Sequence, residues 1–158
     1  MEMTRNQSYA DKVASQNYPD ETMVPLDDFF TDSRGEIQNL LLTPITSVAR
    51  ITSKRGTVRA NHYHLTDWHY AFLESGEIYY FERPVGDQAI PNPTKIKPGS
   101  MFFTPPNVEH AMLFTQDTVF FTFAKNIRSH ESHESDLVRV AFITEEVACR
   151  FLLTSETE

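Results

Sequence analysis

Four histidines stand at spacings that indicate a metal or acid/base site. His62 and His64 are one residue apart, so in a strand both imidazoles point to the same side. His69 follows a short turn and can return beside them, and His110 follows a second turn far along the chain. Imidazole is a frequent ligand of transition metals, and a mononuclear centre needs three or four such donors. We therefore expect His62, His64, His69 and His110 to hold one divalent metal, which the residues do not distinguish among zinc, iron, manganese and nickel.

Two other features carry chemistry near this group. Arg59 precedes the histidine pair, and a guanidinium suits a phosphate or carboxylate of a ligand. Arg59, His62 and His64 are therefore the candidate catalytic residues. His130 and His133 also have a ligand-like spacing, but their surroundings are charged and rich in serine, and we interpret this stretch as a solvated loop.

The elements that must position these residues are short strands. Runs rich in Val, Ile, Phe, Tyr and Thr are broken by Gly, Pro, Asp and Asn, which is typical of an all-β sandwich or barrel. The pattern predicts a double-sheet jelly roll. The expected strands are 36–42, 47–52, 57–60, 69–73, 77–82, 94–97, 100–104, 110–114, 118–124 and 137–143.

The length of 158 residues predicts one domain, the barrel at 23–145, with an N-terminal arm at 1–22 and a C-terminal tail at 146–158. The strands 77–82 and 118–124 are apolar on both faces, whereas a sandwich strand with one solvated face alternates. One face should pack inside the barrel and the other against an arm or a second subunit. We therefore expect a homodimer.

Composition excludes several classes of partner. The net charge of -8 argues against nucleic acid or an anionic membrane surface, since either needs a clustered basic face. No apolar run approaches the roughly 20 residues of a membrane span, and the first 30 residues contain no secretory pattern. The single cysteine, Cys149, excludes an intramolecular disulfide. These observations predict a cytoplasmic protein whose partner is a small-molecule substrate.

The histidines and glycines together resemble the two motifs of the cupin superfamily. The first motif, G-x5-H-x-H-x3-4-E-x6-G, is matched at Gly56, His62, His64 and Gly76, with His69 where the family usually has glutamate. The second, G-x5-P-x-G-x2-H-x3-N, is matched at Gly99, Pro105 and His110, with Asn107 and Phe114 at the two differing positions. The resemblance implies a double-stranded β-helix barrel, the cupin jelly roll, with a metal at its histidines. Replacing glutamate by histidine would make the centre less anionic and a stronger Lewis acid.

A narrower resemblance points to one branch of this superfamily. The segments FFTDSRGEI and RGTVRANHYH are similar to the deoxysugar 3,5-epimerases and 3,4-ketoisomerases that act on sugar nucleotides. That likeness implies acid/base histidines that need no metal, whereas His69 and His110 favour a metal.

Three functions follow as alternatives. The first is a metal-dependent isomerase or epimerase of a small oxygenated substrate, a carbohydrate or sugar-nucleotide intermediate, in which the metal polarises a carbonyl and a histidine moves the neighbouring proton. The second is a mononuclear non-haem iron or manganese dioxygenase. The third is a non-catalytic ligand-binding cupin.

Overall fold

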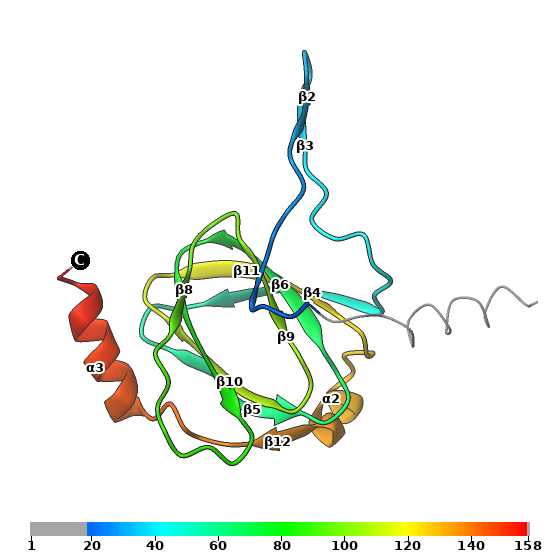
Figure 1. The fold of residues 1–158 in the computed structure, drawn as a ribbon. Coiled ribbons are helices and arrows are strands. Elements are labelled where there is room, and N and C mark those ends of the chain that lie inside the picture. Colours follow the sequence, from blue (N-terminus) through cyan, green and yellow to red (C-terminus); the bar gives the residue numbers. More distant parts are fainter. Residues whose placement is uncertain (1–18, 158) are drawn as a thin grey trace, which may run out of the picture.

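Antiparallel strands dominate residues 19–157, the part of the chain that the computed structural model describes (Figure 1). The first sheet contains, in spatial order, β1 (Met23–Val24), β9 (Met101–Thr104), β6 (His69–Ser75), β11 (Thr118–Ala124) and β4 (Ser47–Ser53). The second contains β12 (Leu137–Arg139), β5 (Val58–His64), β10 (Val108–Phe114), β7 (Ile78–Pro84) and β8 (Thr94–Ile96). Most consecutive strands switch sheets, and this winding confirms the predicted all-β jelly roll.

The core lies between the two sheets and follows from the two-residue period of the strands. Leu73, Tyr80, Phe114 and Phe120 come from four different strands and are almost completely buried in one cluster. Alternate residues of each strand point inward, so side chains from facing sheets meet in the middle. This packed layer supports one end of the barrel interior, and the histidines line a cavity beside it.

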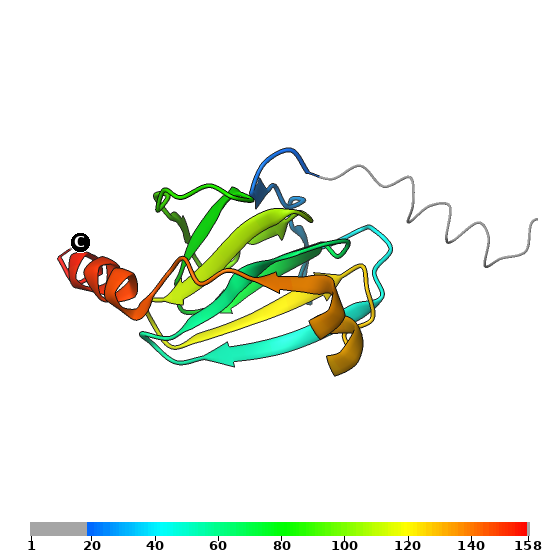
Figure 2. The same cartoon turned by 90° about the horizontal axis from the view of Figure 1, so that it is seen from below.

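The outer face of the second sheet is covered by the chain itself. Tyr79 and Phe81 of β7 pack against Phe142, Ile143 and Val147 of the C-terminal segment. Residues 146–158, expected to be a tail, instead belong largely to α3 (Glu145–Ser155), which lies on the outside of the barrel (Figures 1 and 2). The second apolar face of β7 is therefore an intrachain contact, and this strand gives no reason to expect a second subunit.

The outer face of the first sheet is covered by the segment that precedes β4. Trp68, Tyr70 and Phe103 form a buried cluster that includes Leu26 and Leu40. Within the same segment, β2 (Phe30–Asp32) and β3 (Gly35–Ile37) form a hairpin that projects away from the barrel (Figure 1). The strand expected at 36–42 is therefore much shorter. The side chains of Phe30 and Ile37 are 60% and 62% exposed, so the hairpin has no apolar partner within residues 19–157.

Most of the expected N-terminal arm, residues 1–18, lies outside the described residues. Within residues 19–157 no helix has the length and apolar character that crossing a membrane requires.

Candidate metal centre

A bulge in β5 aims His62 into the barrel. The pairing of β5 with β10 skips Asn61, and both Ala60 and Asn61 have positive φ, of 68° and 54°. Asn61 is locked in place, because its side chain donates to the carbonyl of Ile143 (3.0 Å) and accepts from the same residue's N–H (3.1 Å). Its carbonyl also accepts from the N–H of Val140 at 2.8 Å. The C-terminal segment thus fixes the backbone next to His62.

Because Ala60 is strained in this conformation, Ala60→Gly is expected to stabilise the protein. A positive φ costs an L-residue about 1–2 kcal/mol, and glycine relieves this strain. Glycine also gives the unfolded chain more conformational freedom, which cancels part of the gain. We expect a rise of about 0.5–1 kcal/mol in the free energy of unfolding, measured by urea denaturation. The control is Ala49→Gly in β4, whose φ is not positive, where glycine should destabilise. Equal effects at the two positions would contradict the assignment of strain to Ala60.

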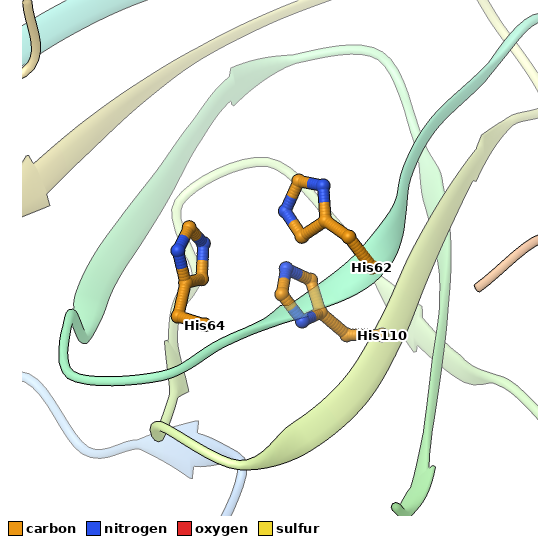
Figure 3. A group of neighbouring side chains, drawn as sticks. All are labelled: His62, His64 and His110. Atoms are coloured by element: carbon orange, nitrogen blue, oxygen red, sulfur yellow. The ribbon is translucent and has the colours of Figure 1, made fainter. Parts of the chain in front are cut away.

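Three of the four predicted histidines meet inside the barrel (Figure 3). His62 and His64 come from one side of β5, and His110 stands opposite His62 on β10. Ring centroids are 4.9 Å apart for His62 and His64, 4.8 Å for His62 and His110, and 5.5 Å for His64 and His110. One nitrogen of each ring lies within 4.8 Å of the others. We call these three residues the histidine trio.

Each ring of the trio has a buried nitrogen without a hydrogen-bond partner. These atoms are Nδ1 of His62, Nδ1 of His64 and Nε2 of His110. His110 Nδ1 lies 3.1 Å from the carbonyl of Val108, and since a carbonyl only accepts, Nδ1 carries the proton and Nε2 keeps its lone pair. His64 Nδ1 is 3.4 Å from a carboxylate oxygen of Asp136 but is not aligned for a hydrogen bond. Buried polar atoms are rarely left unpaired, so the trio is suited to a ligand.

Burial keeps these imidazoles neutral. It lowers the pKa of His62 to about 2, with the neighbouring histidines acting in the same direction, and lowers the pKa of His110 to about 3. The pKa of His64 is also lowered by burial, against the opposing effect of Asp67 and Asp136. Neutral imidazole is the form that binds a metal ion, so the trio is held in a ligand-competent state.

The same shifts predict that the metal-free protein loses stability as the pH falls below 6.5. The unfolded chain protonates these histidines near their ordinary pKa of 6.5, whereas the folded protein keeps His62 and His110 neutral down to about 2 and 3. At a pH between the pKa of the folded state and that of the unfolded state, the unfolded chain binds more protons. Each pH unit of acidification then lowers the free energy of unfolding by up to about 1.4 kcal/mol for each histidine. Urea midpoints of chelator-treated protein at pH 7, 6 and 5 measure this slope. A His62→Gln/His110→Gln variant should give a flatter profile, and an identical one would contradict the assignment.

His69, the fourth predicted ligand, lies beside the trio without joining it. Its ring centroid is 5.6 Å from that of His64 and 5.8 Å from that of His110. Its nitrogens are not among those within 4.8 Å of one another. Burial, and then the nearby histidines, place its pKa well below the usual value, so it is a neutral base at the edge of the site.

His133 was missed by the sequence interpretation, which treated its surroundings as a solvated loop. The stretch is instead a short helix, α2 (His130–Asp136), started by Ser129, whose hydroxyl accepts from the N–H of Ser132. His133 is half-buried, with its ring centroid 5.7 Å from that of His64 and 6.3 Å from that of His62. The spacing of His130 and His133 was a signal, but only the position of α2 shows which of the two reaches the site.

Asp136, the last residue of α2, holds this helix against the turn at 65–68, and Asp67 ties that turn to residue 126. Asp136 accepts from the backbone N–H groups of Thr66 and Asp67 at 3.0 Å each, and from the hydroxyl of Thr66 at 2.6 Å. Asp67 is buried and accepts from the N–H groups of Trp68 and Asn126. With His64 they form a second group with metal-ligand spacing. Because both carboxylates already accept backbone hydrogen bonds, we assign them to positioning α2 and the turn at 65–68.

The histidines surround a cavity of about 120 Å³. The trio, His69 and His133 line it together with two arginines, Arg59 and Arg128. Arg59 was expected from the sequence, but Arg128 was not, because no motif surrounds it. The apolar part of the lining comes from Ile51, Ala60, Met112, Phe120 and Ala124.

The two-sheeted jelly roll, with histidines gathered inside the barrel, is the cupin fold. No family model matches the sequence, and no curated protein matches it either. The resemblance is therefore one of structure, and it confirms the fold that the two motifs predicted.

Solved structures with this fold include three sugar-metabolism proteins. One is QdtA, a sugar 3,4-ketoisomerase from Thermoanaerobacterium thermosaccharolyticum in complex with TDP, with a TM-score of 0.57, 17% identity, and coverage of 78% of this chain and 92% of that one. A second is the dTDP-6-deoxy-D-glucose-3,5-epimerase RmlC from Legionella pneumophila in complex with dTDP-4-keto-L-rhamnose, with a TM-score of 0.57, 12% identity, and coverage of 77% and 73%. The third is the capsular polysaccharide assembling protein CapF from Staphylococcus aureus, with a TM-score of 0.53 and 22% identity; the match covers 73% of this chain but only 34% of CapF.

Proposed function

We propose that this chain is a metal-dependent isomerase or epimerase that acts on a small carbonyl-containing substrate of the carbohydrate or sugar-nucleotide class. The observation that carries the proposal is the convergence of three buried histidines, since one ring nitrogen each of His62, His64 and His110 lies within 4.8 Å of the others. One metal ion can bind a nitrogen from each of three such rings. The metal is a divalent transition metal of the group zinc, iron, manganese and nickel.

The spacing of the trio fits one ion after a small inward movement of the rings. Metal–nitrogen bonds of about 2.1 Å allow ligand nitrogens to be separated by up to about 4.2 Å. One nitrogen of each ring already lies within 4.8 Å of a nitrogen of each of the other two rings. His110 is also oriented as a ligand should be, since its second nitrogen is held by the carbonyl of Val108.

His69 is the candidate fourth ligand or, alternatively, the base of the reaction. The two roles are separable with His69→Ala. If His69 is a ligand, the variant binds metal more weakly; if it is the base, metal content stays unchanged and turnover is lost. Both quantities are measured on the same sample.

The chemistry follows from neutral histidines in a small cavity. A bound divalent metal supplies Lewis acidity toward a carbonyl oxygen. His69 and His133 have lowered pKa values because burial disfavours their charged forms, so at neutral pH both are in the unprotonated form that a general base needs. Either can remove the proton from the carbon beside the carbonyl and return it. Delivery of a proton to the same carbon from the opposite face, by the other histidine or by water, gives epimerisation. Delivery to the former carbonyl carbon, while its oxygen gains a proton and the neighbouring hydroxyl loses one, gives isomerisation.

The comparisons support this reaction class. Two of the structural neighbours are a sugar 3,4-ketoisomerase and a dTDP-sugar 3,5-epimerase, and both reactions shift a proton next to a carbonyl. Neither likeness identifies the substrate of this chain.

Elemental analysis of protein purified without chelator tests the proposal. We expect about one equivalent of a transition metal per chain, which follows from one trio per barrel. Exchange of substrate protons with deuterated solvent, followed by proton NMR over a panel of keto sugars, then tests the reaction. The proposal would be refuted if the protein, purified without chelator, contained no metal and exchanged no substrate proton with the solvent. Iron-dependent oxygen consumption would assign the chain to the dioxygenases instead, since an isomerase consumes no oxygen.

We also propose that the protein forms a homodimer through the β2–β3 hairpin. Its support is the exposure of Phe30 and Ile37 on an element that projects from the barrel. A Phe30→Asp/Ile37→Asp variant should run as a monomer in size-exclusion chromatography with light scattering, while the wild type runs as a dimer. A monomeric wild type at micromolar concentration would contradict this.

A further inference from the structure

Two arginines line the histidine cavity. Arg59 crosses from β5 to β4, where its Nε donates to the hydroxyl of Ser53 at 2.6 Å and its Nη2 to the carbonyl of Thr52 at 3.0 Å. Arg128 follows β11 and donates from Nη1 to the hydroxyl of Thr122 at 2.9 Å. No ion pair among the described residues includes either arginine. Each guanidinium uses only one or two of its five donors on the protein.

The charges around the cavity leave it positive. Its histidines are neutral at pH 7, and Asp67 is the only carboxylate in the lining. Burial lowers the pKa of Arg128, against the opposing effect of Asp67, whose single charge is not enough to neutralise two arginines. Both arginines line the cavity from exposed positions, and in a chain of net charge -8 they form a local positive site that favours an anion.

The volume of the cavity limits the size of the ligand that carries the anionic group. The cavity is about 120 Å³, whereas pockets for drug-sized ligands are about 300–1,000 Å³. A nucleoside diphosphate sugar is at least as large as such ligands, so this cavity encloses only part of one, although Arg59 also lines a second cavity of about 650 Å³. A carboxylate or a phosphate monoester on a short carbon chain has the right size. Both are planar or fork-like acceptors that a guanidinium binds with two parallel hydrogen bonds.

We propose that Arg59 and Arg128 form an anion-binding subsite of the cavity, and that the substrate is a small sugar acid or sugar phosphate whose anionic group they hold. This narrows the substrate class of the proposed function and rests on it for the position of the reacting carbonyl. Binding of the anion itself does not depend on the metal. The arginines are therefore specificity-determining residues, and the trio and its metal act on the other end of the substrate.

The test measures anion binding by isothermal titration calorimetry, with inorganic phosphate, glycolate, glucose and TDP as probes. It is carried out on protein as purified and after chelator treatment, so that phosphate bound by a metal is distinguished from phosphate bound by arginine. Arg59→Gln and Arg128→Gln each remove one guanidinium. The matched control is Arg50→Gln on β4, which removes the same charge from an exposed position outside the cavity. Thermal melting checks that each variant is folded.

We expect the wild type and Arg50→Gln to bind phosphate and glycolate equally, with or without metal, and to ignore glucose. Affinity should fall at least about tenfold in Arg59→Gln and in Arg128→Gln, because each loses a charge-assisted pair. Unchanged affinity in both variants, or no phosphate binding by the wild type, overturns the subsite. TDP binding at least tenfold tighter than phosphate overturns the small-anion assignment.

The same samples separate this inference from the proposed function. Arginine-dependent anion binding in a protein that is isolated without metal supports the subsite and removes the metal-dependent reaction. If the protein contains one equivalent of metal but shows no arginine-dependent anion binding, the metal site is supported and the anion-binding subsite is overturned. A further test of the subsite needs no variant. Wild-type protein should have a higher melting temperature in phosphate than in glucose, because phosphate binds the folded state.

Discussion

The His62→Ala/His64→Ala variant is expected to lose bound metal and all turnover while keeping its fold. These two imidazoles are two thirds of the trio. Loss of an outer-shell partner alone weakens metal binding about 10- to 100-fold, so loss of two direct ligands should exceed about a hundredfold. Elemental analysis after gel filtration and proton exchange from a substrate measure the two losses.

The control is His130→Ala, which removes a histidine from the exposed start of α2. It should leave metal content and turnover unchanged. A double variant that retains metal and activity at wild-type levels would show that the site has been assigned to the wrong residues. Far-UV circular dichroism distinguishes that outcome from loss of fold.

The second large effect is expected at Gly76, where Gly76→Ala should destabilise the protein by at least about 3 kcal/mol. Its φ is 92°, and an added Cβ would lie 2.5 Å from the carbonyl oxygen of Asp117 and 2.7 Å from Cα of Thr118. Because these are backbone atoms, they cannot move aside as a flexible side chain could. The free energy of unfolding in urea measures the loss.

Gly86 supplies a matched control for Gly76. Its φ is 86°, nearly the same, but nothing lies within 4 Å of an added Cβ. Gly86→Ala should therefore cost only the conformational strain, about 1–2 kcal/mol. The difference between the two variants isolates the steric term. Equal costs would mean that the glycine in the first cupin motif is needed for its backbone conformation alone.

Most of the strands and the pair of His62 and His64 were predictable because their signals are local. The run at 118–124 has the predicted bounds in the structure, since its alternating Val and Phe residues form a strand regardless of their neighbours. His62 and His64 share a side because the period of a strand is two residues. His110 required the second motif, because nothing close in sequence links it to the pair.

The residues that were missed depend on contacts between distant parts of the chain. His133 and Arg128 lie at the cavity because Asp136 binds the turn at 65–68, about seventy residues earlier. The stretch at 130–136 is polar on every side and buries no residue of α2, so it lacks the amphipathic pattern that predicts a packed helix.

Two other differences have simpler causes. The helix at the C-terminus had a start signal, since Thr144 is an N-cap that accepts from the N–H of Val147, with acidic residues in the first turn. The motif placed His69 at a ligand position, but it did not fix the direction of the side chain. Its ring lies at the edge of the trio because β6 belongs to the facing sheet.

The clamp between Asn61 and Ile143 determines when during synthesis the site becomes complete. The ribosome releases the chain from its N-terminus, so the strands up to β11 emerge before β12, which pairs with β5 beside His62 and His64. Until residue 143 has emerged, the bulge next to His62 has no lock. A nascent chain therefore forms most of the barrel before it can bind a ligand, and a product truncated ahead of β12 has strands and histidines but no finished site.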